Sequence, residues 1–270
     1  MGDIVDINGE ASCDRFGAER AQLVVVDSQS SYGAAFADVY DEWYGDSDSI
    51  DDVVSLLSER NPRRVLELGV GTGRIALPLA ARLLTRGEIR YSGIDESAEM
   101  LQRLRTKDER GLVECVVGDM VDDQPSEKFD LVFVSYNTLF NLDDRDRQRR
   151  CIAYAAQRLA ADGLLIIDAC VIDENAPTKG STIDRRGSWT LHTSSSFDVR
   201  SGLLTGEIDS RHDDGRRVAR PFRVTYSRPA MVDEMCTSAG LTLDRRFGSW
   251  QRDPFDEDSP RHVSIYRLVR

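Results

Sequence analysis

The sequence has no long hydrophobic segment, and its cysteines follow neither a metal-binding nor a disulfide pattern. None of its apolar runs approaches the ~18 residues that a membrane-spanning helix needs. The first twenty residues lack the basic and apolar regions of a signal peptide. The five cysteines are odd in number and show no close pairing or metal-type spacing. We therefore expect a cytoplasmic protein without a metal site.

Basic residues are outnumbered by acidic ones. The 270 residues include 47 Asp and Glu against 35 Lys and Arg, so the formal net charge is -12. Such a surface repels nucleic-acid phosphates and anionic lipid, and it attracts cationic small molecules such as amines. We expect no nucleic-acid or membrane partner. The hydrophobic content of 40% and the chain length predict one large domain, or one domain with an insertion.

Strands and helices alternate regularly between residues 64 and 172. Nearly continuous apolar runs predict strands, and helical patterns separate them. The predicted strands are RVLELG (64–69), IRYSGID (89–95), VECVVGD (113–119), FDLVFVS (129–135) and GLLIIDACV (163–171). The predicted helices cover roughly 73–85, 97–106 and 145–161. This order predicts an α/β fold with a parallel sheet that is covered by helices on both faces.

Two further helices are predicted before this alternation begins. In YGAAFADVYDEWYGD (32–46), apolar and aromatic residues recur three and four positions apart and form one face of a helix. The second helix lies in SIDDVVSLLSER (49–60), where Asp48 or Ser49 is suited to cap its start. Residues 1–30 show no sustained period, which indicates a loose extension.

The pattern changes after Ile172. Alternating polar and apolar residues with turns at RSG (200–202) and DDG (213–215) predict a small antiparallel sheet. A helix at 228–240 and strands at 241–250 and 261–269 follow. The expected divisions are an extension at 1–30, a core with N-terminal lid helices at 31–175, a β cap at 176–227 and a return to the core at 228–270.

The stretch VLELGVGTGR (65–74) is a glycine loop between a strand and a helix. Bare backbone at such a loop allows a ligand to approach closely, and free amides point outward. Dinucleotides and S-adenosylmethionine are the two competing ligand classes. The dinucleotide pattern requires Gly or Ala where this chain has Arg74, and its glycines lie at 69, 71 and 73 instead.

Four ordered motifs resemble those of the class I S-adenosylmethionine-dependent methyltransferases. They are VLELGVGTGR, YSGIDESAEML (91–101), VVGDM (116–120) and FDLVFVSYNTLFNL (129–142). The resemblance covers about residues 32–172 and implies a Rossmann-like, seven-stranded sheet that binds S-adenosyl-L-methionine. The residues that it places around this cofactor are Tyr44, Glu67, Gly69, Gly71, Arg74, Asp95, Glu96, Met100, Asp119, Met120, Ser135 and Tyr136.

Several of these positions also have purely structural explanations. The resemblance places Asp95 at the ribose hydroxyls and Asp119 at the adenine amino group, although either carboxylate also suits a turn. Met100, at helical spacing, also suits the core. Gly73 is explained either by the ligand or by helix-on-strand packing. Glu67 lies inside an apolar strand, so its carboxylate requires a partner.

A narrower resemblance concerns the aromatic residues. SYGAAFADVYDEWY (31–44) and SYNTLFNL (135–142) look like motifs of actinobacterial antibiotic-tailoring N-methyltransferases of aminosugars and lincosamides. The resemblance places Tyr32, Tyr40 and Phe140 at the acceptor amine, beneath an N-terminal helix that closes over the cofactor. Aminosugar enzymes often have His where this chain has Phe140, which favours the lincosamide type. We expect Trp43 to pack against the sheet.

The insertion at 176–227 is expected to roof the site, with Trp189, His192, Phe222 and Trp250 as candidate walls. Because such inserts often pair between subunits, a homo-oligomer is a reasonable hypothesis. The function predicted is methylation of an amine on a small natural product, by in-line transfer that needs no strong base. The alternatives are an O-methyltransferase, a nicotinamide oxidoreductase and a non-catalytic cofactor-binding protein.

Overall fold

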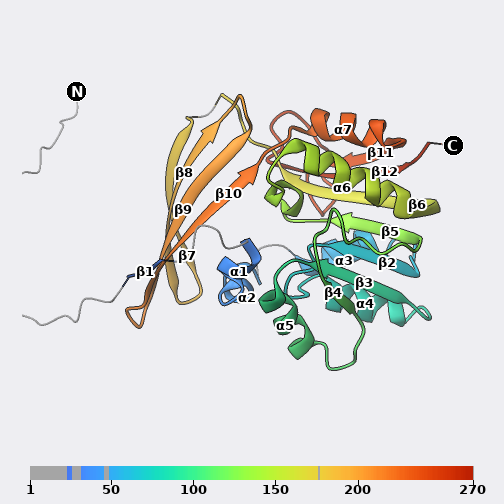
Figure 1. Cartoon of the computed structure of the whole chain (residues 1–270), viewed down its shortest axis with the longest axis horizontal. Coiled ribbons are helices and arrows are strands. Elements are labelled where there is room, and N and C mark those ends of the chain that lie inside the picture. The colour runs from blue at the N-terminus through green and yellow to red at the C-terminus, as the bar shows by residue number, and fades with distance from the viewer. Residues whose placement is uncertain (1–22, 26–31, 46–48, 176, 270) are drawn as a thin grey trace, which may run out of the picture.

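A computed structural model describes residues 23–25, 32–45, 49–175 and 177–269 (Figure 1). Two sheets form the molecule, a large one in the core and a smaller one in the cap. The proposed helix cap Asp48 and all of residues 1–22 lie outside the described residues. Leu23–Val25, within the extension expected to be loose, forms strand β1, which pairs in parallel with a strand of the cap.

The core sheet has seven strands in the order β11-β12-β6-β5-β2-β3-β4, as the family resemblance implies. Its bounds are β2 Arg64–Leu68, β3 Arg90–Asp95, β4 Glu114–Val117, β5 Phe129–Val134, β6 Leu159–Cys170, β11 Leu241–Phe247 and β12 Arg261–Leu268. The first five of these are mutually parallel, whereas β12 runs antiparallel to β6 and β11 antiparallel to β12. The sheet expected to be parallel is therefore mixed, because its last two strands form a hairpin.

Helices cover both faces of this sheet, as predicted. Their bounds are α3 Ile50–Leu57, α4 Ala76–Leu84, α5 Ala98–Lys107, α6 Arg145–Arg158 and α7 Pro229–Ser238. Alternate residues of β5 point to opposite faces: Val132 packs with α6 and α7, and Phe133 with α3, α4 and α5. None of the described helices is long and apolar enough to cross a membrane.

The single lid helix expected at 32–46 is two short helices, α1 Tyr32–Phe36 and α2 Tyr40–Tyr44. The backbone of Val39 (φ -118°, ψ -5°) departs from helical geometry between them. Phe36, Val39 and Trp43 are nevertheless buried in one cluster with residues of the cap. The predicted apolar face is therefore present, but Trp43 packs against Trp189 of the cap and not against the core sheet, where it was expected.

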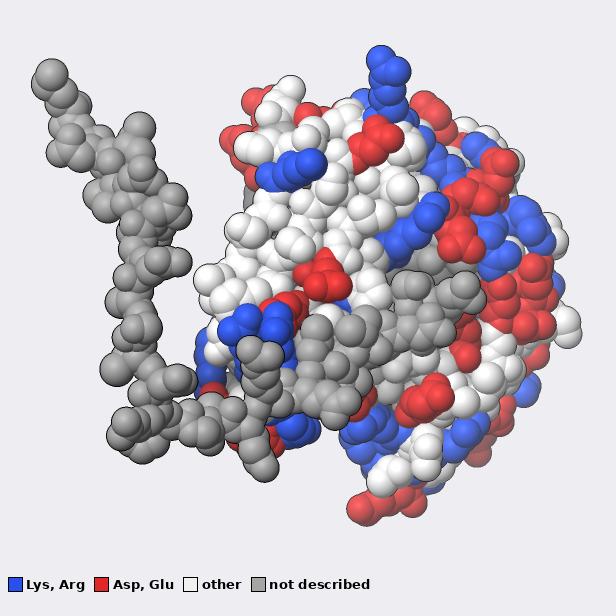
Figure 2. Space-filling model, turned by 60° about the vertical axis from the view of Figure 1, so that its left-hand side comes forward, with Lys and Arg blue, Asp and Glu red and all other residues white. Residues whose placement is uncertain are grey.

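The cap is an antiparallel sheet of β7 Lys179–Arg186, β8 Trp189–Asp198, β9 Leu203–His212 and β10 Arg217–Thr225, with β1 added beside β10. Figure 1 shows it beside the core, with α1 and α2 lying between the two. Figure 2 shows the cap side of the surface, where acidic and basic side chains are interspersed around a largely uncharged area. The negative net charge does not gather into one patch on this face.

Candidate functional site

A cavity of about 360 Å³ lies where the core, the lid helices and the cap meet. It opens at the carboxyl ends of the parallel strands, beside the point where β2 lies between β3 and β5. Ligands of open α/β sheets bind at this kind of switch in strand order. A more open hollow of about 660 Å³ lies at the opposite strand ends, beside Pro62, Asp130 and Arg267, and none of the residues predicted to hold the cofactor or the acceptor lines it.

The first end of the cavity, which we call the sheet end, is formed by the loops that follow β2, β3 and β4. Its lining residues from these loops are Gly69, Gly71, Asp95, Glu96, Asp119 and Met120. Gly33, Met100 and Arg147 also line the cavity. Met100 is almost fully buried, so it serves both the core and the cavity.

The three glycines of the loop are required for different reasons. All have positive φ, which disfavours other residues. A Cβ at Gly69 would lie 2.3 Å from the Thr138 methyl group, and one at Gly73 would lie 2.8 Å from Leu104. A Cβ at Gly71 would meet nothing within 4 Å. Gly73 is thus explained by helix packing, whereas Gly71 presents bare backbone beside an open space that a ligand can enter.

Asp95 ties the glycine loop to the start of α5. Its carboxylate accepts hydrogen bonds from the amides of Gly71 (2.8 Å) and Ser97 (2.9 Å). Burial raises the pKa of Asp95, and these two amides act in the opposite direction. A carboxylate held by backbone amides at the cavity surface is well suited to accept hydrogen bonds from hydroxyl groups of a ligand.

Asp119 forms an ion pair with Arg147 from α6, and both line the cavity. Partial burial raises the pKa of Asp119, but hydrogen bonds from the Val121 amide and Arg147 lower it overall. The carboxylate therefore stays ionised at neutral pH and remains a hydrogen-bond acceptor. Arg147 belongs to none of the sequence motifs. It lies at the start of α6 in a run of acidic and basic residues, which does not distinguish it from its neighbours.

Glu67 is buried beneath the glycine loop and does not line the cavity. Its carboxyl accepts a hydrogen bond of 2.6 Å from the Tyr91 hydroxyl, so the required partner is present. Burial raises the pKa of Glu67 to about 8, although Tyr91 and Arg74 lower it. The Glu67 carboxyl inside β2 is therefore mostly protonated at neutral pH.

Arg74 and Ser135 also lie behind the cavity surface and not in it. The guanidinium of Arg74 lies 3.8 Å from the centre of the Tyr136 ring and donates a hydrogen bond to the Tyr44 carbonyl. It thus joins two aromatic residues that do line the cavity. Ser135 is buried, and its carbonyl accepts the Thr138 amide in the turn that follows β5.

The middle of the cavity is lined by Tyr32, Tyr40 and Tyr44 of the lid and by Phe140 of the short helix η1, Thr138–Asn141. The Tyr32 hydroxyl lies 3.4 Å from that of Tyr44. Burial raises the pKa of Tyr40 to about 12 and that of Tyr32 well above its usual value. These phenols are therefore neutral at physiological pH and serve as hydrogen-bonding groups, not as bases.

The lid is attached to both neighbouring parts of the molecule. Asp41 accepts hydrogen bonds from the Thr72 hydroxyl of the glycine loop (2.6 Å) and from Lys107 of α5 (2.9 Å). The next residue, Glu42, accepts one from the indole of Trp189 in the cap (3.1 Å). Adjacent lid residues therefore link the glycine loop and the cap.

The second end, which we call the cap end, is lined by Cys170 at the end of β6 and Ile172 after it, by Leu204 of β9, and by Phe222, Val224 and Tyr226. The last three alternate along β10 and the residue that follows it, so they share one face. This confirms that the insertion roofs the cavity. Of its candidate walls, however, only Phe222 is in the lining.

The other candidate walls lie elsewhere. Trp189 is buried against Trp43 beneath the lid, with ring centres 5.9 Å apart, and Trp250 is buried in the core beside α3 and α4. His192 lies opposite Asp209 in the register of β8 and β9, outside the cavity. Choosing large aromatic residues from the sequence therefore did not identify the roof residues, because the strand register determines which side chains point into the cavity.

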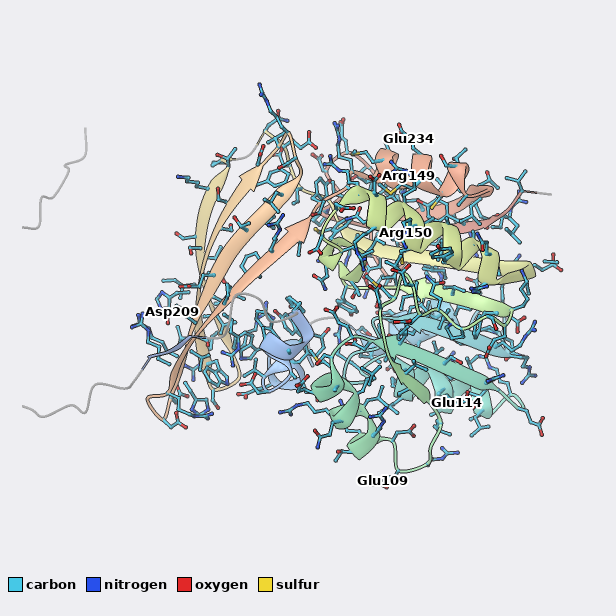
Figure 3. The ribbon with its side chains drawn as sticks, in the orientation of Figure 1. Glu109, Glu114, Arg149, Arg150, Asp209 and Glu234 are labelled. Carbon is cyan, nitrogen blue, oxygen red and sulfur yellow. The ribbon has the colours of Figure 1, made fainter. Side chains whose placement is uncertain are left out.

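Charged side chains are confined to the sheet end among the described lining residues. They are Asp95, Glu96, Asp119 and Arg147. Figure 3 shows other charged residues, including Glu109, Glu114 and Asp209, on outer parts of the core and cap and away from the lid helices. In the described part of the chain, no three His, Cys, Asp or Glu side chains are grouped as metal ligands.

Comparisons with known proteins agree with this geometry. Residues 65–163 match a family model described as a methyltransferase domain. A search of curated protein sequences found no match. The CcbJ methyltransferase from Streptomyces caelestis is similar over 90% of this chain and 100% of its own, with 31% identity and a TM-score of 0.80.

Two solved structures at lower identity share the fold. The sugar N-methyltransferase KedS8 from Streptoalloteichus is 19% identical, with a TM-score of 0.65 over 90% of this chain and 98% of its own. The amino pentose methyltransferase CalS10 from Micromonospora echinaspora, involved in calicheamicin biosynthesis, is 18% identical, with a TM-score of 0.63 over 83% and 94%.

Proposed function

The chain belongs to the class I S-adenosylmethionine-dependent methyltransferases, and we propose that it methylates an amine nitrogen of a small natural product of the lincosamide or aminosugar type. The similarity to CcbJ, over 90% of this chain and 100% of its own, supports methyl transfer as the reaction. The aromatic motifs that resemble those of antibiotic-tailoring N-methyltransferases support the choice of acceptor. The neutral, aromatic middle of the cavity is the observation that carries the choice of nitrogen.

The sheet end fits S-adenosylmethionine. Gly71 leaves open space at the cavity surface, and the carboxylates of Asp95 and Asp119 are hydrogen-bond acceptors for hydroxyl and amino groups. Met100 and Met120 offer apolar surface to a flat ring. When bound, this cofactor supplies a methyl group that is already activated on a sulfonium.

The residues in the middle of the cavity hold the acceptor and exclude water. The faces of Tyr32, Tyr40 and Phe140 attract a cationic centre, and the neutral hydroxyls can orient an amine by hydrogen bonds. A neutral amine has a free lone pair, so its methylation needs positioning more than a base. A hydroxyl acceptor must lose its proton, and the phenols, with their raised pKa values, do not accept it at neutral pH.

Mass spectrometry tests the proposal directly. The protein is incubated with S-adenosylmethionine and either N-demethylated lincosamides or aminosugars, and with the corresponding compounds whose amine is replaced by hydroxyl. We expect a gain of one CH2 on the amine compounds only. Methylation of the hydroxyl compounds would establish the O-methyltransferase alternative, and tight cofactor binding without turnover of either series would favour a non-catalytic role.

The cellular setting is part of the proposal. We propose a cytoplasmic enzyme that takes a small-molecule amine, has no nucleic-acid or membrane partner, and forms a homo-oligomer. The scattered cysteines and the negative net charge support the first points. Analytical ultracentrifugation of the whole chain tests the last one, because a monomeric mass would contradict it.

A further inference from the structure

Five apolar side chains line the cap end and the adjoining turn after η1, and we call them the apolar wall. They are Leu142, Ile172, Leu204, Phe222 and Val224. Leu204 and Val224 are direct partners in the antiparallel register of β9 and β10. Phe222 lies two residues before Val224 and therefore on the same face of the strand. The cap thus contributes three of the five residues, and the core contributes the other two.

Several polar groups beside the apolar wall are engaged within the protein, whereas the Asn141 carboxamide lines the cavity next to Leu142. The hydroxyl of Tyr226 accepts the Ile172 amide at 3.2 Å, and Tyr226 packs edge-on against Phe140. Burial raises the pKa of Cys170 to about 11, so its thiol is neutral. The charged lining residues of the described chain lie at the sheet end, where Asp119 and Arg147 neutralise one another.

This distribution discriminates between classes of amine. A hydroxyl group moved from water against an apolar surface loses its hydrogen bonds, which disfavours binding. A hydrocarbon group in the same place is favoured in proportion to the area that it removes from water. A polyhydroxylated sugar ring bearing the amine would place several hydroxyls against this wall, whereas an alkyl-bearing ring would place hydrocarbon there.

On the premise that the enzyme methylates an amine, we infer that its acceptor carries an alkyl or other hydrocarbon group next to the amine, and that this group packs against the apolar wall. The wall therefore selects against polyhydroxylated aminosugars. Phe222, Val224 and Leu204 are specificity residues in this account, whereas the lid tyrosines hold the amine itself.

Binding of two matched amines separates this inference from the proposed function. The probes are ethylpiperidine and hydroxymethylpiperidine, substituted at the same ring carbon, which differ by CH3 in place of OH. Each is titrated by calorimetry into the full chain saturated with S-adenosylhomocysteine. We expect the ethyl compound to bind at least about tenfold more tightly, as the loss of one hydroxyl's hydration predicts.

Two near-isosteric variants test whether the apolar wall causes the preference for the ethyl compound. Val224→Thr places a hydroxyl in the apolar wall and should reduce the preference to about threefold or less. Val199→Thr makes the same change on the cap at the partly exposed turn between β8 and β9, outside the cavity, and should leave the preference unchanged.

Equal binding of the two probes, tighter binding of the hydroxymethyl compound, or binding of neither would overturn the inference. So would equal effects of the two valine variants. The proposed function is judged separately, by whether either probe gains a methyl group on nitrogen when S-adenosylmethionine replaces S-adenosylhomocysteine. N-methylation of both probes at equal efficiency would retain the proposed function and reject the wall as a determinant of specificity.

Discussion

The two ends of the cavity are lined by different kinds of chemical group. At the sheet end, backbone and charge dominate: Gly71 presents bare main chain, and Asp95 and Asp119 are held by backbone amides and Arg147. At the cap end, side chains of β9 and β10 dominate, and most are apolar. The lid tyrosines lie between the two ends.

This difference shows how one protein can combine a fixed cofactor with a variable acceptor. A site made of backbone depends on the fold and on a few glycines, so it tolerates little change. A site made of strand side chains changes with each substitution while the ladder of hydrogen bonds is kept. Under the proposed function, the sheet end therefore binds the cofactor, and the cap end selects the acceptor.

The largest effect is expected at Gly71. Gly71→Ala should weaken S-adenosylhomocysteine binding by about a hundredfold in calorimetry, because the added methyl projects where the ligand approaches the bare backbone. The strained φ of +54° should also lower stability by about 1 kcal/mol.

Gly111→Ala is the matched control for this strain. Gly111 has a φ of +61°, its Cβ would also meet nothing within 4 Å, and it lies outside the cavity. Stability should fall by about the same 1 kcal/mol, without a change in ligand affinity. A similar loss of S-adenosylhomocysteine affinity in both variants would contradict the proposal that the ligand closely approaches the backbone of Gly71.

Removing a lid hydroxyl should affect the acceptor and not the cofactor. Tyr40→Phe should lower kcat/KM for the amine by about tenfold or more, because the ring remains but a hydrogen bond to the amine is lost. Its S-adenosylhomocysteine affinity should stay within about twofold. Tyr154→Phe, on α6 outside the cavity, should change neither quantity. Parallel losses of turnover and cofactor affinity in Tyr40→Phe would contradict the division between the two ends.

The free energy of unfolding should depend on pH through Glu67, which is buried beneath the sheet end. Its folded pKa of about 8 lies above the ordinary value of 4.5. The resulting stabilisation is complete below about pH 4.5 and is lost as the pH rises through about 8. Between pH 6 and 7, the unfolding free energy should therefore fall by about 1 kcal/mol more in the native chain than in Glu67→Gln.

Denaturant melts at several pH values measure this difference. Tyr91→Phe is the informative companion, because the Tyr91 hydrogen bond lowers the pKa of Glu67. Loss of this hydrogen bond should raise the pKa of Glu67 further, so the unfolding free energy should continue to fall up to a higher pH. Identical pH profiles of the native chain and Glu67→Gln would show that Glu67 is ionised in the folded state over the whole range.

The smallest effect concerns the contact between the lid and the glycine loop. Asp41→Asn removes the charge that Lys107 pairs with and weakens the bond from Thr72. S-adenosylhomocysteine affinity should fall about threefold, mainly through faster dissociation, as stopped-flow displacement would show. Asp51→Asn, an exposed change on α3, should have no effect. An unchanged dissociation rate in Asp41→Asn would mean that the lid contact does not retain the ligand.

The sequence was most informative about the sheet end. Gly69, Gly71, Asp95, Asp119 and Met120 lie at the ends of strands that the apolar runs located closely, and all of them line the cavity. These residues sit next to strand ends, so local sequence determines their position. The turn after β5 is a partial exception, because only the structure shows that Thr138 is the group closest to Gly69.

The cap end was predicted only in outline. The antiparallel insertion and the role of Phe222 were expected, but Leu204 and Val224 were not, although the alternation of β10 pointed to Val224. Their partners Leu142 and Ile172 lie far away in the sequence. Which face of the cap points inward depends on register and on the packing of Trp189 against the lid, and neither is a local property.

Isotope labelling distinguishes methylation of nitrogen from methylation of oxygen within one acceptor. The full chain is incubated with S-adenosylmethionine that carries a deuterated methyl group and with an acceptor that has both a secondary amine and a hydroxyl group. Fragmentation mass spectrometry then locates the label. We expect deuterated methyl on nitrogen alone, whereas label on oxygen would contradict the assignment of the aromatic middle of the cavity to an amine.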